Sequence, residues 1–293
     1  MLAARFDVEE GGDLRRRVAG AAALVADPTV PVDAELLDAA GDSLRVVANF
    51  AVGYDNIDVD ACRARGVVVT NTPDVLTNAT AELAVALMLA AARRLGEAER
   101  LVRAGRWAGW EPGQLLGREL SGTIVGIVGL GRIGTRVAEL LRGFDVALLG
   151  TSRSPHPEVE QRLAVERVSF DELVERADFV TLHVPLSEET RHLVDDDALA
   201  RFKPGAILVN TARGGLVDSG ALVRALRAGR LAAAGLDTYE NEPHVPQELV
   251  ELENVVLAPH IGSATATARD AMARLVAENV IAVLEGHDPV TPV

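Results

Sequence analysis

The chain has 293 residues, 48% of them hydrophobic and 25% charged, which is ordinary for a globular protein and long enough for two domains. Its formal net charge of −14 has the wrong sign for non-specific binding to nucleic acid and gives no attraction to acidic membranes. An anionic ligand therefore requires a local cationic site.

Short apolar runs alternate with helical patterns along the chain, as in βαβ units of a parallel sheet. Helical runs from about 77 to 95 and from about 267 to 285 would connect a central domain to one made of both chain ends. We predict an α/β fold with two Rossmann-like, doubly wound parallel-sheet domains, residues 73–265 being inserted between residues 1–72 and 266–293. The strands are predicted at residues 22–26, 44–48, 67–70, 123–128, 146–149, 179–182, 206–210, 233–236 and 255–258.

The single cysteine, Cys62, cannot form an internal disulfide, and we expect it to pack in a core. The longest apolar run, residues 83–92, is too short to cross a bilayer, and we expect no secretory signal. The sequence predicts a cytoplasmic protein without a nucleic-acid partner, a membrane partner or a metal site.

Three glycines, Gly129, Gly131 and Gly134, follow one predicted strand and open an amphipathic helix. In this context the first glycine permits a tight turn, the second lets a pyrophosphate approach the backbone, and the third lets helix and strand pack closely. The helix N-terminus offers free N–H groups to the phosphates. Residues 73–265 are therefore predicted to bind a dinucleotide.

The end of the next strand bears on which dinucleotide binds. NAD sites usually place Asp or Glu there, but here Ser152 and Arg153 occupy the position. A hydroxyl and a guanidinium can bond and neutralise a 2′-phosphate. We therefore predict a preference for NADP(H), with NAD(H) as the alternative; a merely solvated arginine is the competing interpretation.

Polar residues follow three later strands: Arg213, then Asp237 with Glu242, then His260. Ligands of open α/β sheets bind beyond the carboxyl ends of the strands, so these side chains are expected in one cleft. An arginine can hold a carboxylate and polarise a ketone, and a histidine can donate a proton near neutral pH. Glu242 or Asp237 could hold the imidazole. Each residue alone is more commonly a surface, cap or turn residue.

Several motifs together resemble the D-isomer-specific 2-hydroxyacid dehydrogenases over nearly the whole chain. Residues 71–77 (NTPDVLT) and Ser152-Arg153 are most similar to the glyoxylate/hydroxypyruvate reductase branch. The family motifs are VGYDNID at 52–58, GLGRIG at 129–134, HVPL at 183–186, VNTARGG at 209–215, GLD at 235–237, EP at 242–243 and PHIG at 259–262.

This resemblance implies reduction of a small 2-oxo acid with NAD(P)H. Arg213 would bind the substrate, His260 and Glu242 would form the acid/base pair, and Asp237 would lie behind them and orient them. Backbone N–H groups of Val52 and Gly53 in the substrate-binding domain would hold the carboxylate. The implied cofactor contacts are Thr80, Leu130, Gly131, Arg132, Ile133, Ser152, Arg153, Ser154, Val184, Pro185, Thr211, Ala212, Asp237, His260 and Gly262.

The family is dimeric through its nucleotide-binding domains, so a homodimer is expected. Trp110 would either reach the neighbouring active site or, as the favoured interpretation, be a plain interface or core residue. Family members usually begin with a strand and helix, roughly 25 residues, that are absent here. Either the start of the chain is misassigned or the substrate-binding domain lacks its usual first strand, which would leave a sheet edge or neighbour unpaired.

Alternatives within the family are 3-phosphoglycerate and phosphite dehydrogenases. A non-catalytic, nucleotide-sensing scaffold similar to the corepressor relatives is the alternative outside enzymology.

Overall fold

The computed structural model describes residues 1–11 and 13–293. These residues form two compact units, Met1–Thr77 with Ser263–Val293, and Asn78–Gly262. The first unit contains both chain ends, and the second is inserted into it. The boundaries expected from the sequence, 72/73 and 265/266, differ from this division by a few residues.

The first unit contains a parallel sheet in the order β1-β2-β3, with β1 at an edge. Leu36, Val47 and Cys62 belong to the core on one face, while Val276 and Val280 of α12 pack against the other. Cys62 is buried as expected, and burial raises the pKa of its thiol to about 11. The elements are η1 (Leu2–Ala4), α1 (Leu14–Arg17), β1 (Ala23–Ala26), α2 (Ala34–Ala40), β2 (Val46–Asn49), α3 (Val59–Ala64), β3 (Val68–Thr70) and α12 (Ala266–Leu284).

The second unit contains a parallel sheet in the order β10-β9-β8-β7-β4-β5-β6. The chain starts at β4, proceeds to β6 at one edge, and returns to β7 on the other side of β4. This reversal creates a switch point between β4 and β7, beyond whose carboxyl ends ligands bind in such folds. The strands are β4 (Ile124–Val128), β5 (Ala147–Thr151), β6 (Val165–Arg167), β7 (Phe179–Leu182), β8 (Ala206–Asn210), β9 (Leu231–Leu236) and β10 (Val255–Leu257).

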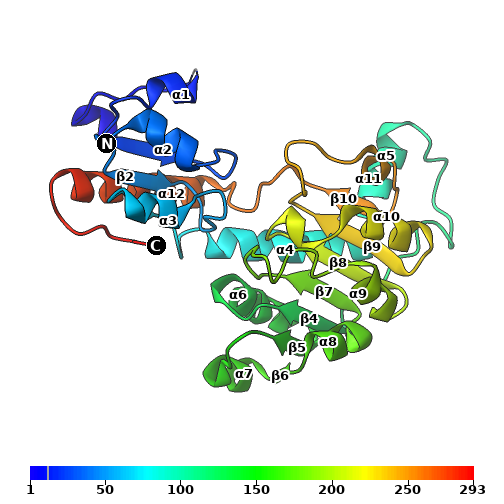
Figure 1. Ribbon diagram of the computed structural model, residues 1–293. Helices are drawn as coiled ribbons and strands as arrows, with labels where there is room; N and C mark the ends of the chain where they lie inside the picture. The colour runs from blue at the N-terminus through cyan, green and yellow to red at the C-terminus, as the bar shows by residue number, and fades with distance from the viewer. Residues whose placement is uncertain (12) are drawn as a thin grey trace. The chain divides into compact units, whose positions relative to one another are not determined.

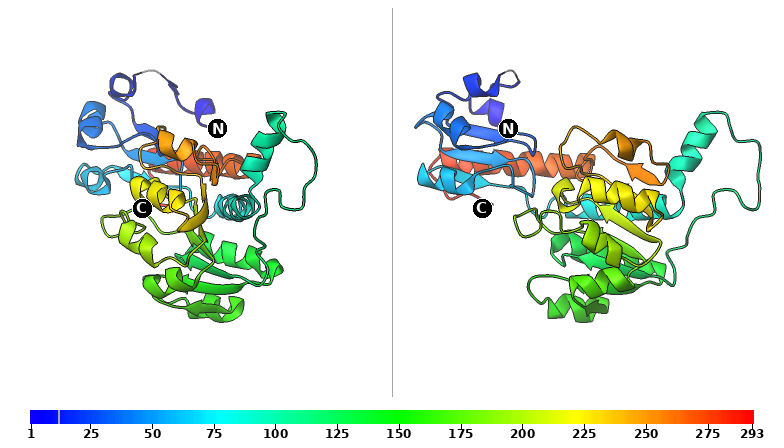
Figure 2. Two further views of the ribbon diagram at one scale, coloured as in Figure 1. Left: turned by 90° about the vertical axis from the view of Figure 1, so that its right-hand side faces the viewer. Right: turned by 45° about the vertical axis from the view of Figure 1, so that its right-hand side comes forward.

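Helices cover both faces of this sheet (Figures 1 and 2). One core joins the strands to α4, α6 and α7, and a second core joins them to α8, α9 and α10. Because both faces are buried, the strands consist of nearly continuous apolar runs. The helices are α4 (Thr77–Ala92), α5 (Leu95–Arg103), α6 (Arg132–Leu141), η2 (Arg142–Phe144), α7 (Pro157–Leu163), α8 (Phe170–Arg176), α9 (Asp196–Arg201), η3 (Gly214–Leu216), α10 (Ser219–Arg227) and α11 (Gln247–Val250).

The predicted fold class is confirmed, with two local differences. Strand β6 was not predicted, because in this short edge strand only Val165 is buried. The helical run expected to residue 95 ends at Ala92, since Arg94 adopts a left-handed conformation and a separate helix, α5, starts at Leu95. No helix among the described residues is both long and apolar enough to span a membrane.

Candidate active site

The glycine-rich turn after β4 requires glycine for steric reasons that the structure makes explicit. Gly129 has a φ of +101°, and a Cβ there would lie 2.6 Å from the carbonyl oxygen of His183. A Cβ on Gly134 would lie 1.9 Å from the carbonyl oxygen of Gly129. By contrast, a Cβ on Gly131 would meet no atom within 4 Å. The turn is therefore packed on two sides and open at its middle glycine.

The open side of this turn fits a dinucleotide. Helix α6 begins directly after Gly131, and no side chain caps its N-terminus, so its first N–H groups can receive a phosphate. Thr211, after β8, is buried, and its Oγ1 has no hydrogen-bond partner among the described residues. A buried hydroxyl without a partner is costly, which favours a ligand at this edge. When bound there, a nicotinamide dinucleotide supplies a hydride.

The loop after β5 carries the residues expected to select the cofactor. The hydroxyl of Ser152 donates to the carbonyl of Ser154 at 2.7 Å. Arg167, at the end of β6, donates to the carbonyl of Ser152 at 3.3 Å. Arg153 is exposed, and Asp145 lies before β5, not at its end. The loop therefore presents hydroxyls and a guanidinium at the end of β5.

Other residues expected to contact the cofactor have different environments. Leu130 is almost completely buried in the core on the α4 face, so only its backbone can face a ligand. Ile133, in the first turn of α6, is half-buried, as is Val184 after β7, whereas Pro185 is exposed. Thr80 on α4 donates through its hydroxyl to the carbonyl of Gly262 at 3.2 Å.

The backbone of His183 lies against Gly129 of the glycine-rich turn, and the chemistry of its ring differs from that of His260. Its backbone N–H donates to Val128, and its ring Nε2 lies 2.9 Å from the hydroxyl of Thr181. Burial lowers the pKa of His183 to about 3. The ring is therefore neutral at physiological pH, which makes it unsuitable as a proton donor.

The loop that carries Arg213 is shaped by the buried side chain of Asn210. The amide of Asn210 donates to the carbonyl of Arg213 at 2.8 Å and accepts from the N–H of Ala212 at 3.0 Å. The guanidinium of Arg213 donates to the carbonyl of Ala212 at 2.9 Å. This small network fixes residues 211–213 just beyond the end of β8.

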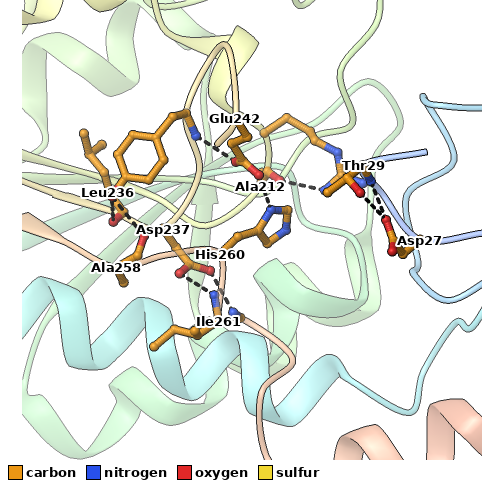
Figure 3. A network of polar contacts seen from close by, with 12 residues as sticks. Asp27, Thr29, Ala212, Leu236, Asp237, Glu242, Ala258, His260 and Ile261 are labelled. Atoms are coloured by element: carbon orange, nitrogen blue, oxygen red, sulfur yellow. Dashed lines mark hydrogen bonds and ion pairs between the residues drawn. The ribbon is translucent and has the colours of Figure 1, made fainter. Parts of the chain in front are cut away.

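Glu242 and His260 form a hydrogen-bonded pair (Figure 3). Oε2 of Glu242 lies 2.7 Å from Nδ1 of His260, and Oε1 accepts the N–H of Tyr239 at 2.9 Å. Burial raises the pKa of Glu242, but the hydrogen bonds and the charges of His260 and Arg213 outweigh it and leave this pKa below its usual value. Because an ionised carboxylate only accepts, Nδ1 of His260 carries the hydrogen, and Nε2 remains for a ligand.

Asp237 hydrogen-bonds to the backbone next to His260, whereas the ring of His260 is hydrogen-bonded to Glu242. The carboxylate is completely buried and accepts the N–H groups of Ile261 and Gly262, both at 2.7 Å (Figure 3). Burial raises the pKa of Asp237, and these two bonds together with the charge of His260 only partly oppose the increase. Tyr239 supports the same region, since its hydroxyl donates to the carbonyl of Ala258 at 2.9 Å. Of the two carboxylates considered from the sequence, Glu242 is the one that contacts the imidazole.

In the first unit, the carbonyl groups of the loop after β2 accept hydrogen bonds from nearby residues of the same unit. The amide of Asn49 donates to the carbonyl of Gly53 at 2.7 Å, and the amide of Asn71 donates to the carbonyl of Val52 at 2.8 Å. The carbonyl of Ala51 accepts the N–H of Thr72 at 2.9 Å. With three consecutive carbonyls bound in this way, the N–H groups of Val52 and Gly53 are directed away from them.

The second unit brings Arg213, Glu242 and His260 together, with Asp237 behind them. Val52 and Gly53 belong to the first unit. The supporting residues Asn210 and Tyr239 were not expected from the sequence, although a polar residue at the end of β8 and an aromatic residue after β9 were visible in it.

Comparison with known proteins identifies relatives along almost the entire chain. Residues 85–262 match the profile of the D-isomer specific 2-hydroxyacid dehydrogenase, NAD binding domain. The chain is 50% identical over 303 aligned residues to a glyoxylate reductase of Thermococcus onnurineus, covering 99% of this chain and 90% of the relative.

Solved structures give the same result. An NADPH-dependent glyoxylate/hydroxypyruvate reductase of Sinorhizobium meliloti, in complex with NADP and malonate, is 40% identical with a TM-score of 0.85, covering 93% of this chain and 83% of that one. A glyoxylate reductase of Paecilomyes thermophila is 38% identical with a TM-score of 0.86 and the same two coverages. The resemblance predicted from the sequence motifs is confirmed: the chain belongs to the D-isomer specific 2-hydroxyacid dehydrogenase family.

Proposed function

We propose that this dehydrogenase reduces glyoxylate or hydroxypyruvate to the 2-hydroxy acid, using NADPH in preference to NADH. One observation carries the proposal: Nδ1 of His260 lies 2.7 Å from Oε2 of Glu242. The charge of Arg213 acts on the same carboxylate. A cation, a proton donor and a carboxylate that holds the donor are the groups needed to reduce a 2-oxo acid.

Each of the three residues has a defined task in the proposed reaction. The guanidinium of Arg213 holds the substrate carboxylate and polarises the ketone. Nε2 of the His260 imidazolium donates a proton to the carbonyl oxygen, which becomes the hydroxyl group while the ring becomes neutral. Glu242 stabilises the imidazolium and fixes its orientation. Val52 and Gly53 add backbone N–H groups for the substrate carboxylate.

The similar proteins support this choice of substrate, because the relatives from Thermococcus onnurineus and Sinorhizobium meliloti carry glyoxylate reductase activities in their names. 3-Phosphoglycerate and phosphite dehydrogenation remain the alternatives among reactions. A nucleotide-sensing scaffold remains the alternative without catalysis.

The test mixes the purified protein with each small 2-oxo acid and follows the absorbance of NADPH and NADH. We expect rapid oxidation of NADPH with glyoxylate or hydroxypyruvate. The variant His260→Gln should lose most of kcat, because it removes the proton donor, with a much smaller effect on NADPH binding, since His260 is one of many proposed cofactor contacts. Tight binding of NADPH without turnover of any 2-oxo acid would favour the scaffold and contradict the proposal.

The preference for NADPH rests on the loop after β5, where Ser152, Arg153 and Ser154 lie and where no carboxylate would repel a 2′-phosphate. Arg153→Ala removes a charge-assisted contact worth about 1.5–3 kcal/mol, which corresponds to roughly a tenfold to hundredfold increase in the KM for NADPH. The KM for NADH should change little. An equal loss for both cofactors would contradict this role of Arg153.

The remaining contacts proposed for the cofactor come from three groups of residues. The turn contributes Leu130, Gly131, Arg132 and Ile133, the strand ends contribute Val184, Pro185, Thr211 and Ala212, and the region around His260 contributes Thr80, Asp237, His260 and Gly262.

We further propose a homodimer. Leu95 and Val102 of α5, and Trp107, Trp110 and Leu116 of the extended segment after it (Figure 2), are large hydrophobic side chains that are exposed. Trp110 is 80% exposed, so a core role for it is wrong, and an interface role or a reach into the neighbouring active site remains. Light scattering during size-exclusion chromatography should give twice the mass of the chain, and Trp110→Ala should weaken the dimer. A monomeric mass at micromolar concentration would contradict this.

A cytoplasmic location stays a prediction.

A further inference from the structure

A second histidine–glutamate pair lies beside Glu242 and was not expected from the sequence. Nε2 of His192 lies 2.6 Å from Oε1 of Glu240. The two side chains are 38% and 25% exposed, so the pair is partly shielded from water. Glu240 precedes Glu242 by two residues, in the loop after β9. The pair therefore attaches the loop that carries Glu242 to a segment 48 positions earlier in the chain.

The backbone of the same segment is also bound to the loop that carries Arg213. The N–H of His192 donates to the carbonyl of Gly215 at 2.8 Å, and the N–H of Val194 donates to the carbonyl of Leu216 at 3.0 Å. Gly215 follows Arg213 by two residues. His192 thus holds the Arg213 loop with its backbone and the Glu242 loop with its side chain.

The two loops are themselves in direct contact at Gly214. A Cβ on this glycine would lie 1.9 Å from the carbonyl carbon of Tyr239 and 2.3 Å from the nitrogen of Glu240. His192 has a φ of +51°, in the left-handed region that most residues avoid. Such a conformation persists where the surroundings hold it firmly.

We propose that His192 and Glu240 are positioning residues that fix Glu242 relative to Arg213. The proposal rests on the proposed function of that site. Since Oε1 of Glu242 accepts the N–H of Tyr239, a displacement of residues 239–240 displaces the carboxylate that orients His260. A misplacement of about 1 Å at a reacting group can reduce a rate by a factor on the order of 100.

The test changes Glu240 and leaves His192 in place, because histidine tolerates positive φ better than most residues and its replacement would change the backbone preference as well as the side chain. Glu240→Ala removes the acceptor, whereas Glu240→Gln keeps an oxygen acceptor on a side chain of the same length. Asp196→Asn is the matched control: it weakens the exposed pair of Asp196 with Arg224 in the same unit. All variants are assayed with the full-length enzyme, NADPH and glyoxylate or hydroxypyruvate.

We expect Glu240→Ala to lower kcat by about tenfold or more while the KM for NADPH stays within about twofold of the wild type. Glu240→Gln should recover most of kcat, and Asp196→Asn should behave as the wild type. An unchanged kcat in Glu240→Ala would overturn the proposal. So would a loss of kcat with an equal loss of NADPH affinity, because that pattern indicates general disruption of the unit.

A second measurement does not depend on turnover. The Nδ1 proton of His260, bound to Glu242, should give a low-field proton NMR resonance that is identified by its disappearance in His260→Gln. We expect this resonance to shift or broaden in Glu240→Ala and to be preserved in Glu240→Gln. An unshifted resonance in Glu240→Ala would overturn the positioning role. Failure of the wild type to reduce any 2-oxo acid would instead contradict the proposed function, with the NMR result still testing the pair.

Discussion

Replacement of Asp237 by asparagine should destabilise the second unit and impair the reaction together. The buried carboxylate accepts the N–H groups of Ile261 and Gly262, each at 2.7 Å. These two residues directly follow His260 in the chain. The amide oxygen of an asparagine can accept only one of these bonds with its former geometry. Its NH2 group would face the other N–H, and two donors would then lie opposite each other.

The size of the effect follows from these two bonds. A hydrogen bond to a charged group is worth about 1.5–3 kcal/mol, and a buried donor left without an acceptor costs about 1–3 kcal/mol. Part of this loss is offset, because burying the charged Asp237 carboxylate is itself unfavourable, as its raised pKa indicates, and the neutral asparagine avoids that cost. We therefore expect a net loss of about 2–3 kcal/mol in the free energy of unfolding, or a decrease in Tm of about 4–12 °C.

The assay is calorimetric melting of wild type, Asp237→Asn and Asp171→Asn, with kcat measured on the same samples. Asp171 is an exposed partner of Arg201, so its substitution should change the stability by less than about 1 kcal/mol. The kcat of Asp237→Asn should fall, since the backbone next to His260 loses an anchor. A wild-type Tm combined with a wild-type kcat in Asp237→Asn would refute the reasoning.

Three further predictions concern other parts of the molecule. Asn71→Ala removes the donor to the carbonyl of Val52 and should raise the KM for the 2-oxo acid about tenfold without affecting the KM for NADPH; steady-state kinetics showing the reverse would contradict it. Gly134→Ala would place a Cβ 1.9 Å from the carbonyl oxygen of Gly129 and should abolish NADPH binding in a fluorescence titration, so retained affinity would be unexpected. Despite burial, hydrogen bonds and the charges of His260 and Arg213 hold the pKa of Glu242 below its usual value of 4.5, so the unfolded chain binds more protons between the folded and the unfolded pKa. Glu242 therefore contributes stability above pH 4.5 that is lost as the pH falls through its folded pKa; denaturant titrations should show a flatter acid dependence in Glu242→Gln, and identical slopes would exclude this contribution.

The sequence predicted most strands of the second unit because their residues are buried on both faces. A strand such as β7 has four buried residues in succession, which appear as one apolar run. The exception is β6, where Glu166 and Arg167 are exposed and only Val165 is buried. Its position at the sheet edge removes the pattern on which such a prediction depends.

The sequence also predicted that polar residues at the strand ends would gather, since parallel strands bring their carboxyl ends to one edge. It could not distinguish Glu242 from Asp237 as the partner of His260, because both follow β9 within a few residues. The pair of His192 and Glu240 had no signal at all: its members lie 48 positions apart, in loops whose contact depends on the close approach of backbones at Gly214.

Burial separates the polar residues at strand ends into two groups with different tasks. Asn49, Asn210 and Asp237 are at most 1% exposed, and their side chains bond to the backbone of the following or neighbouring loop. The side chains of His260 and Glu242 are 33% and 25% exposed and can still reach a ligand. A buried amide or carboxylate must find its partners inside the protein, and the loop backbone is the nearest source. Residues of the first group therefore determine where the loops lie, and those of the second group act on what the loops surround.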